Sequence, residues 1–160
     1  GIACMLKKNE NFSIIGKAVL GKIPMFGPMF SKMYITVDRR SKESRLDSYK
    51  KSEQTIDEGR SLFFFPEGTI PTEGAPQMIK FKDGAFKLAI EKQVPIVPIS
   101  IPYNWIVLPD SDFLNPRWHL LKFCFHEPID TKGMTQKDLN SLKEKAYNII
   151  DSSIKKHNKL

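Results

Sequence analysis

Two loops of this sequence carry polar groups directly after apolar, strand-like segments. In SLFFFPEGTI, residues 61–70, the apolar run ends at Pro66 and is followed by Glu67, Gly68 and Thr69. A glycine lets the backbone approach a ligand closely, a threonine supplies a hydroxyl, and a carboxylate accepts hydrogen bonds. These residue types are consistent with a binding loop, although proline and glycine also shape ordinary turns.

The second loop follows YITV and has the sequence DRRS, with Arg39 and Arg40. Guanidinium groups present fork-shaped donors that suit phosphate. Glu67 would repel phosphate, so we expect it to hold a ligand hydroxyl or to orient a basic side chain such as Arg39. Taken alone, DRRS is also typical of a solvated turn. Lysines that would add positive charge, if the fold brings them near, are Lys17, Lys80 and Lys82.

Strand-like and helix-like segments alternate along the chain, which predicts an α/β fold with a mixed, largely parallel sheet flanked by helices. The length of 160 residues predicts a single domain, residues 1–160. The expected strands are residues 12–15, 33–37, 62–65, 94–105 and 120–129. The expected helices are residues 41–60, 82–93 and 134–160, with short helical pieces around Pro24 and Pro28. Ligands of open α/β sheets bind beyond the carboxyl ends of the strands, where both loops fall.

Capping residues and apolar stripes define the three longer helices. The expected caps are Ser41 or Ser44 for the first, Asp83 for the second, and a Thr135–Asp138 capping box for the third, and Gly59 is expected to end the first. The side chains expected to face inward are Leu46, Tyr49 and Ile56, then Phe86, Ala89 and Ile90, then Leu139, Leu142, Ala146, Ile149, Ile150 and Ile154.

Composition narrows the class of partner. The net charge of +7 and the pI of about 9.4 favour an anionic partner, which is a phosphorylated small molecule, an anionic membrane or a nucleic acid. A nucleic-acid partner ranks last, because most aromatic residues fall in strand-like runs. Cys4 and Cys124 predict two reduced structural thiols, and Trp105 and Trp118 are expected in the core. No apolar run approaches the ~20 residues that span a bilayer.

Four segments together resemble the glycerolipid acyltransferase family, whose members include the 1-acyl-glycerol-3-phosphate acyltransferases. These segments are GKAVLGKIPMFG, YITVDRRS, FFFPEGT and FKDGAFKLAIEKQVPIVPISI, and they keep the family's order over most of the chain. The most diagnostic is Phe-Pro-Glu-Gly-Thr. In the resemblance, Lys17 takes the place of a family lysine and Arg39 that of an arginine implicated in glycerol-phosphate binding.

The resemblance implies a glycerol-3-phosphate acyltransferase-like fold and a reaction. An acyl group passes from acyl-CoA or acyl-carrier protein, with no further cofactor and no metal, to the free hydroxyl of a lysophospholipid. It also implies association with the cytoplasmic face of a membrane, peripheral or through an anchor. The substrate-binding residues that it implies are Lys17, Arg39, Glu67, Gly68, Thr69 and Lys82.

Two departures from the family pattern affect these expectations. The family's third motif usually continues with arginine, whereas Ile70 stands here, so a phosphate contact is lost or supplied elsewhere, for example by Lys80 or Lys82. The family's catalytic His-x-x-x-x-Asp motif, in which the histidine is the general base, is not matched by His119, His126 or His157. In the family this motif precedes the segment matched by Lys17.

The chain begins at Gly1, so we expect a fragment that lacks the first strand and the catalytic motif and has little or no acyltransferase activity alone. The alternative is a non-catalytic homologue that binds a lysophospholipid or a membrane.

Overall fold

The computed structural model describes residues 12–17, 34–38, 40–69, 76–107 and 117–158, with only the backbone described at residue 17. The chain divides into two compact units, Gly1–Phe65 and Pro66–Leu160. A single domain over residues 1–160 stays a prediction. The helical pieces expected around Pro24 and Pro28 lie outside the described residues.

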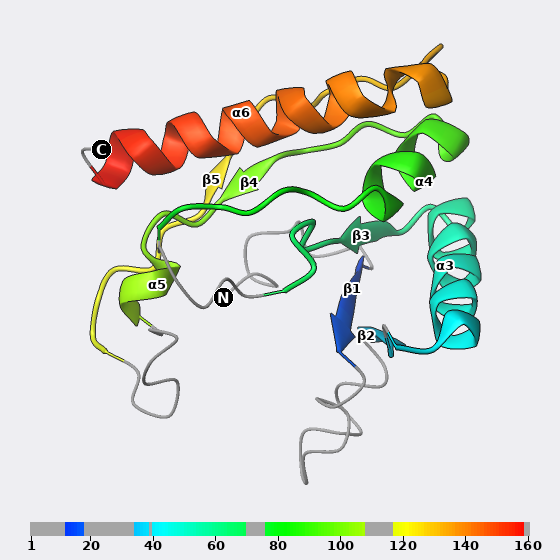
Figure 1. Cartoon of the computed structure of the whole chain (residues 1–160), viewed down its shortest axis with the longest axis horizontal. Coiled ribbons are helices and arrows are strands. Elements are labelled where there is room, and N and C mark those ends of the chain that lie inside the picture. Colours follow the sequence, from blue (N-terminus) through cyan, green and yellow to red (C-terminus); the bar gives the residue numbers. More distant parts are fainter. Residues whose placement is uncertain (1–11, 18–33, 39, 70–75, 108–116, 159–160) are drawn as a thin grey trace, which may run out of the picture. The chain divides into compact units, whose positions relative to one another are not determined.

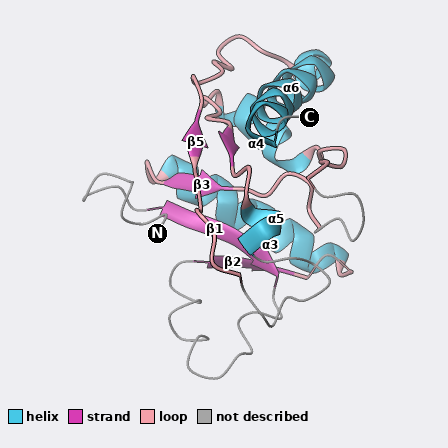
Figure 2. Ribbon diagram, turned by 90° about the vertical axis from the view of Figure 1, so that its left-hand side faces the viewer, coloured by secondary structure: helices cyan, strands magenta, loops and turns pink. Residues whose placement is uncertain are grey.

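A three-stranded parallel sheet forms the first unit, with β1 (Phe12–Lys17) between β2 (Tyr34–Val37) and β3 (Ser61–Phe63) (Figure 2). The strands expected at residues 12–15 and 33–37 are therefore confirmed, the first extending to Lys17. The third strand is shorter than expected, because its pairing with β1 ends at Ile14 and Phe63. Phe65, which was expected inside this strand, is exposed.

Helix α3 (Lys42–Asp57) follows β2 in the chain, precedes β3 and contacts both strands. It begins where expected, because the Ser41 side chain accepts a hydrogen bond of 3.1 Å from the backbone N–H of Ser44. It ends at Asp57, and Gly59, two residues later as expected for a helix stop, has a φ of +73° in the left-handed region that glycine adopts readily.

The buried face of α3 is polar, so the apolar stripe expected for this helix is wrong. Leu46 is 55% exposed, and Tyr49 and Ile56 are only partly buried. The buried residues are Ser48, Ser52 and Thr55, whose hydroxyls donate to the carbonyl oxygens of Arg45, Ser48 and Lys51 at 2.9, 2.7 and 2.7 Å. Because each hydroxyl bonds within its own helix, burial leaves no polar group without a partner.

In the second unit, α4 (Gly84–Lys92) contacts the long helix α6 (Leu139–Asn158) (Figure 1). The buried residues between them form one apolar cluster of Phe81, Phe86, Ile90, Ile129, Leu142 and Ala146. The inward faces expected for both helices are confirmed in that cluster and in Leu139, Ile149 and Ile150, which pack against it. Leu88 is also buried.

The two helices begin differently. The capping box expected before α6 is confirmed, with Thr135 and Asp138 bonded reciprocally around the short 3-10 helix η3 (Gln136–Asp138). Asp83 stands at the N-cap of α4, but its side chain makes no capping bond. Its carboxylate instead accepts a hydrogen bond of 2.6 Å from Lys143 of α6, and this bond lowers the pKa of Asp83.

The two later strands are much shorter than expected. β4 (Ile99–Ser100) pairs antiparallel with β5 (Cys124–Phe125), and a single bridge joins Ile96 to Ile129. Proline has no N–H to donate to a ladder, and the expected strand contains Pro95, Pro98 and Pro102. After β4 the chain enters the short helix α5 (Asn104–Val107).

The two tryptophans have different environments, and the core position expected for Trp118 is wrong. Trp118 is 104% exposed. Trp105 is partly buried, and its indole N–H donates to the carbonyl oxygen of Pro102 at 3.1 Å.

Cys124 is a free thiol of intermediate burial, and Cys4 lies outside the described residues. Within the described part of the chain, none of the helices combines the length and the apolar character needed to cross a bilayer.

The polar face of α3 predicts that substitutions at two positions differ in their effect on stability. Ser52→Leu should lower the free energy of unfolding by about 1–3 kcal/mol, because a larger side chain overpacks a site that is 1% exposed. Leu46→Ala should change it by less than about 0.5 kcal/mol. Urea unfolding of the two variants checks this. A larger loss of unfolding free energy for Leu46→Ala than for Ser52→Leu would support the apolar stripe expected from the sequence.

Candidate functional site

The loop Pro66–Thr69 is fixed by two hydrogen bonds to residues 79–82. The carbonyl oxygen of Pro66 accepts from the backbone N–H of Lys82 at 2.8 Å, and the carboxylate Oε2 of Glu67 accepts from the backbone N–H of Ile79 at 3.0 Å. Between Glu67 and Thr69 the chain turns through Gly68, whose φ is +73°. A Cβ disfavours this conformation, which accounts for glycine in the Pro-Glu-Gly-Thr sequence.

Glu67 has an environment that disfavours its charge. Its side chain is half-buried, and this burial raises its pKa, although the hydrogen bond from Ile79 acts in the opposite direction. The partner that the structure gives to this carboxylate is thus a backbone N–H of its own unit. A carboxylate has two oxygens and accepts several hydrogen bonds, so Glu67 can also accept one from a ligand hydroxyl.

Lys80 and Lys82 lie on either side of an anchored aromatic residue. Phe81 between them is buried in the apolar cluster, 6.0 Å from the ring of Phe86 and 5.2 Å from that of Tyr147. Both lysines are exposed, as is Thr69. The two bonds to Pro66 and Glu67 therefore hold two exposed cations beside the loop in this unit.

The other expected site residues belong to the first unit. The parallel register pairs Lys17, the last residue of β1, with Val37, the last residue of β2. The backbone of Lys17 therefore lies beside the point where β2 passes into DRRS. Arg39 lies outside the described residues.

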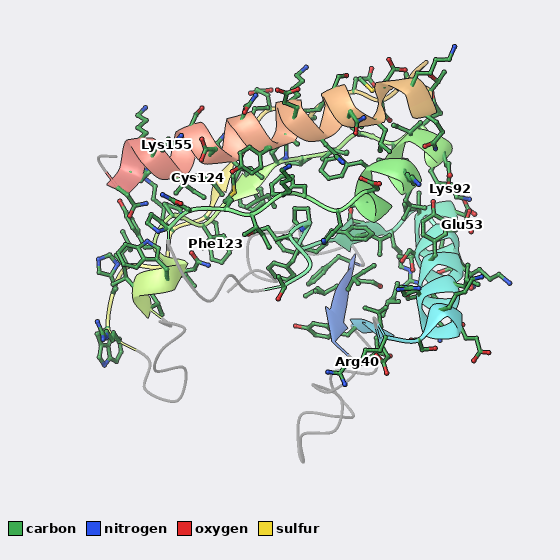
Figure 3. All side chains as sticks on the ribbon, viewed as in Figure 1. Arg40, Glu53, Lys92, Phe123, Cys124 and Lys155 are labelled. Carbon is green, nitrogen blue, oxygen red and sulfur yellow. The ribbon has the colours of Figure 1, made fainter. Side chains whose placement is uncertain are left out.

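The DRRS loop is organised by its own polar side chains. The carboxylate of Asp38 accepts from the backbone N–H of Arg40 at 3.0 Å. The hydroxyl of Ser44, in the first turn of α3, accepts from the backbone N–H of Asp38 at 2.9 Å. Arg40 is exposed beside the end of β2 (Figure 3). The turn expected from the sequence is therefore present, and it leads directly into α3.

The six expected binding residues thus fall into two groups. Lys17 and Arg39 belong to the first unit, and Glu67, Gly68, Thr69 and Lys82 to the second. The structure brings the second group together through the contacts of Pro66 and Glu67. Binding of a substrate by these residues remains a prediction. Ile79, which fixes Glu67, was missed by the sequence analysis, because a backbone donor twelve residues away leaves no pattern in the sequence.

The histidines make polar contacts in the second unit. His126 follows β5, as expected, with its Nε2 2.8 Å from the hydroxyl of Ser100, and the Nε2 of His157 lies 2.9 Å from the ammonium of Lys122. In the part of the chain that the structure describes, no three histidine, cysteine or acidic residues group in a way that could hold a metal ion.

This chain belongs to the Acyltransferase family, whose model matches residues 1–102. An acyltransferase of Schizosaccharomyces pombe described as uncharacterized is 30% identical over 147 residues, which are 90% of this chain and 52% of that protein. A 1-acyl-sn-glycerol-3-phosphate acyltransferase of Haemophilus influenzae is 30% identical over 146 residues, 88% of this chain and 57% of that protein. The chain thus spans about half the length of these curated relatives.

A solved structure has a similar fold. The 1-acyl-sn-glycerophosphate acyltransferase PlsC from Thermotoga maritima matches with a TM-score of 0.66 over 92% of this chain and 57% of that one, at 20% identity. The expected α/β fold with a parallel sheet flanked by helices is therefore confirmed.

The raised pKa of Glu67 predicts a pH dependence of stability. A carboxyl whose pKa is higher in the folded state binds more protons there, so stability falls as the pH rises from the unfolded value of 4.5 through the folded value. Glu67→Gln keeps an acceptor for Ile79 and cannot ionise, so this fall should be smaller. Urea unfolding at several pH values between about 4 and 8 measures it.

The matched control is Glu144→Gln, which alters an exposed carboxylate on α6. Its pH profile should follow that of the parent chain. If the Glu67→Gln profile did so too, the buried, disfavoured charge at this position would be contradicted.

Proposed function

We propose that this protein is an acyltransferase of phospholipid biosynthesis. It transfers an acyl group from acyl-CoA or acyl-carrier protein to the free hydroxyl of 1-acyl-glycerol-3-phosphate or a related lysophospholipid. The observation that carries the proposal is the fixed loop Pro66–Thr69, because it lies within the family match and is bonded through its backbone and Glu67 to a stretch that carries two exposed lysines. A phosphate and a neighbouring hydroxyl are the two groups that such a loop suits.

The parts of the acceptor are assigned to different residues. In line with the family resemblance, Arg39 and Lys17 bind the phosphate. Glu67 accepts a hydrogen bond from an acceptor hydroxyl, and Gly68 lets the loop backbone lie close to the glycerol. Since Ile70 stands where the family usually has arginine, Lys80 or Lys82 is expected to supply the missing contact.

The chemistry is the transfer of an acyl group from the sulfur atom of a thioester to the oxygen atom of a hydroxyl. The acceptor hydroxyl oxygen attacks the thioester carbonyl, the carbon–sulfur bond breaks, and the hydroxyl proton passes through a general base to the leaving thiolate. In the family resemblance that base is a histidine followed five residues later by an aspartate. None of the three histidines in these 160 residues has an aspartate at that spacing.

A second candidate function is a non-catalytic homologue that binds a lysophospholipid at a membrane, which needs the acceptor-binding residues and the basic charge but no general base. Both candidates place the protein at the cytoplasmic face of a membrane, where the net charge of +7 is attracted to anionic lipids. They differ in whether a thiol is released from an acyl donor, and they share the acceptor site.

Acceptor recognition can be tested without catalysis. The chain should bind lysophosphatidate more tightly than the monoacylglycerol of equal chain length, and Arg39→Gln should reduce this preference by about tenfold, since a charge-assisted bidentate contact is lost. Titration calorimetry in detergent below its critical concentration measures both affinities. Arg40→Gln is the matched control, and an equal loss in that variant would show general charge attraction without a site at Arg39.

Thiol release from acyl-CoA separates the two candidate functions. We expect no release above background from the 160 residues alone, and release that depends on lysophosphatidate from any longer product of the same gene that contains a His-x-x-x-x-Asp pair. Binding of lysophosphatidate without thiol release by every product of the gene would establish the non-catalytic homologue.

A further inference from the structure

A short segment between α5 and β5, residues 117–122, presents large apolar side chains to solvent. Trp118 is 104% exposed and Leu120 is 67% exposed, and Leu121 beside them is also exposed. Such a cluster of large apolar side chains on one segment marks an interaction surface. We call residues 117–122 the tryptophan segment.

Three contacts, with α5, with Tyr103 before it and with α6, hold this segment in place. The backbone N–H of Arg117 donates to the carbonyl oxygen of Val107 at 2.8 Å, and the ring of His119 packs 5.2 Å from the ring of Tyr103. The ammonium of Lys122 lies 2.9 Å from His157 of α6. Figure 1 shows the segment, in yellow, running beside α5. The exposed side chains therefore belong to a segment that is anchored at Arg117, His119 and Lys122.

The charged residues within the tryptophan segment are positive. Arg117 and Lys122 belong to the segment, and residues 117–126 contain no aspartate or glutamate. The last turn of α6, which His157 joins to the segment, carries Lys155 and Lys156. Lys155 forms an ion pair of 2.8 Å with Asp151, so it adds little net charge, whereas Lys156 is exposed.

We propose that the tryptophan segment docks on the surface of an anionic lipid bilayer. Tryptophan is enriched at the level of lipid headgroups, leucine enters the acyl boundary, and arginine and lysine bind anionic headgroups. The segment combines all three residue types within six residues, all of them exposed. The proposal deepens the membrane association of the proposed function and rests on it for its biological purpose, but not for its physical argument.

The two tryptophans allow a direct test. In a Trp105→Phe chain, Trp118 is the one remaining indole. Its emission should shift to shorter wavelength on addition of vesicles of phosphatidylcholine with phosphatidylglycerol, and lipids brominated along their acyl chains should quench it. Circular dichroism of Trp105→Phe against the parent checks that the fold is kept, and co-sedimentation of the parent with the same vesicles provides a second measurement that needs no substitution.

Two double variants separate the apolar and the charged contributions. Trp118→Ser with Leu120→Ser should weaken vesicle partitioning by about tenfold or more, because two large side chains no longer leave water. Arg117→Gln with Lys122→Gln should weaken partitioning to anionic vesicles and leave the weaker partitioning to pure phosphatidylcholine unchanged. Leu46→Ala, which removes an exposed leucine elsewhere, is the matched control and should partition like the parent.

Three results would overturn the proposal. One is an unshifted, unquenched Trp118 with vesicles present. Another is equal partitioning of the Trp118→Ser, Leu120→Ser variant and the Leu46→Ala control. A third is a Trp118 shift that appears on raising the protein concentration without vesicles, since the segment would then contact a second copy of the chain. Because these readouts involve neither lysophosphatidate nor acyl transfer, their failure is distinct from failure of the proposed function.

Discussion

The hydrogen bond from Ile79 to the carboxylate of Glu67 is the interaction on which the candidate site depends. It fixes the loop Pro66–Thr69 to residues 79–82, which lead into α4. These residues are themselves held by Phe81, which is buried in the apolar cluster. Without this bond the half-buried carboxylate would lose its backbone partner, and an unsatisfied buried acceptor costs more than the bond itself contributes. The position of Lys80 and Lys82 beside the loop follows from the same contact.

The parts of the fold that follow local rules were predictable from the sequence. The strands β1 and β2, the cap at Ser41, the stop at Gly59 and the capping box at Thr135 each depend on residues a few positions apart. The errors arose where distant partners decide. Proline-containing strands shortened because the ladder, rather than the apolar composition, sets their ends. Leu46 and Trp118 were expected inside on apolar character alone, but hydrophobic residues are also common on protein surfaces.

The candidate site was predictable only as a set of residue types. The sequence indicated that Glu67, Gly68 and Thr69 belong to a loop, and the structure supplies the reason for Gly68 in its positive φ. It also gives Glu67 a structural partner that the sequence could not reveal, because a backbone N–H exists at nearly every position. The register of β1 and β2 likewise places Lys17 beside Val37, although twenty residues separate them in the chain.

The fixed loop separates the residues that hold its shape from the residues that can choose a ligand. Residues 79 and 82 contribute backbone N–H groups to the loop, and the exposed side chains of Lys80 and Lys82 are not needed for either bond. Substitution at these lysines can therefore change the charge beside the loop while the loop keeps its conformation. Such an arrangement makes the surface charge of this region adjustable at single exposed positions, while Glu67 and Gly68 keep the architecture.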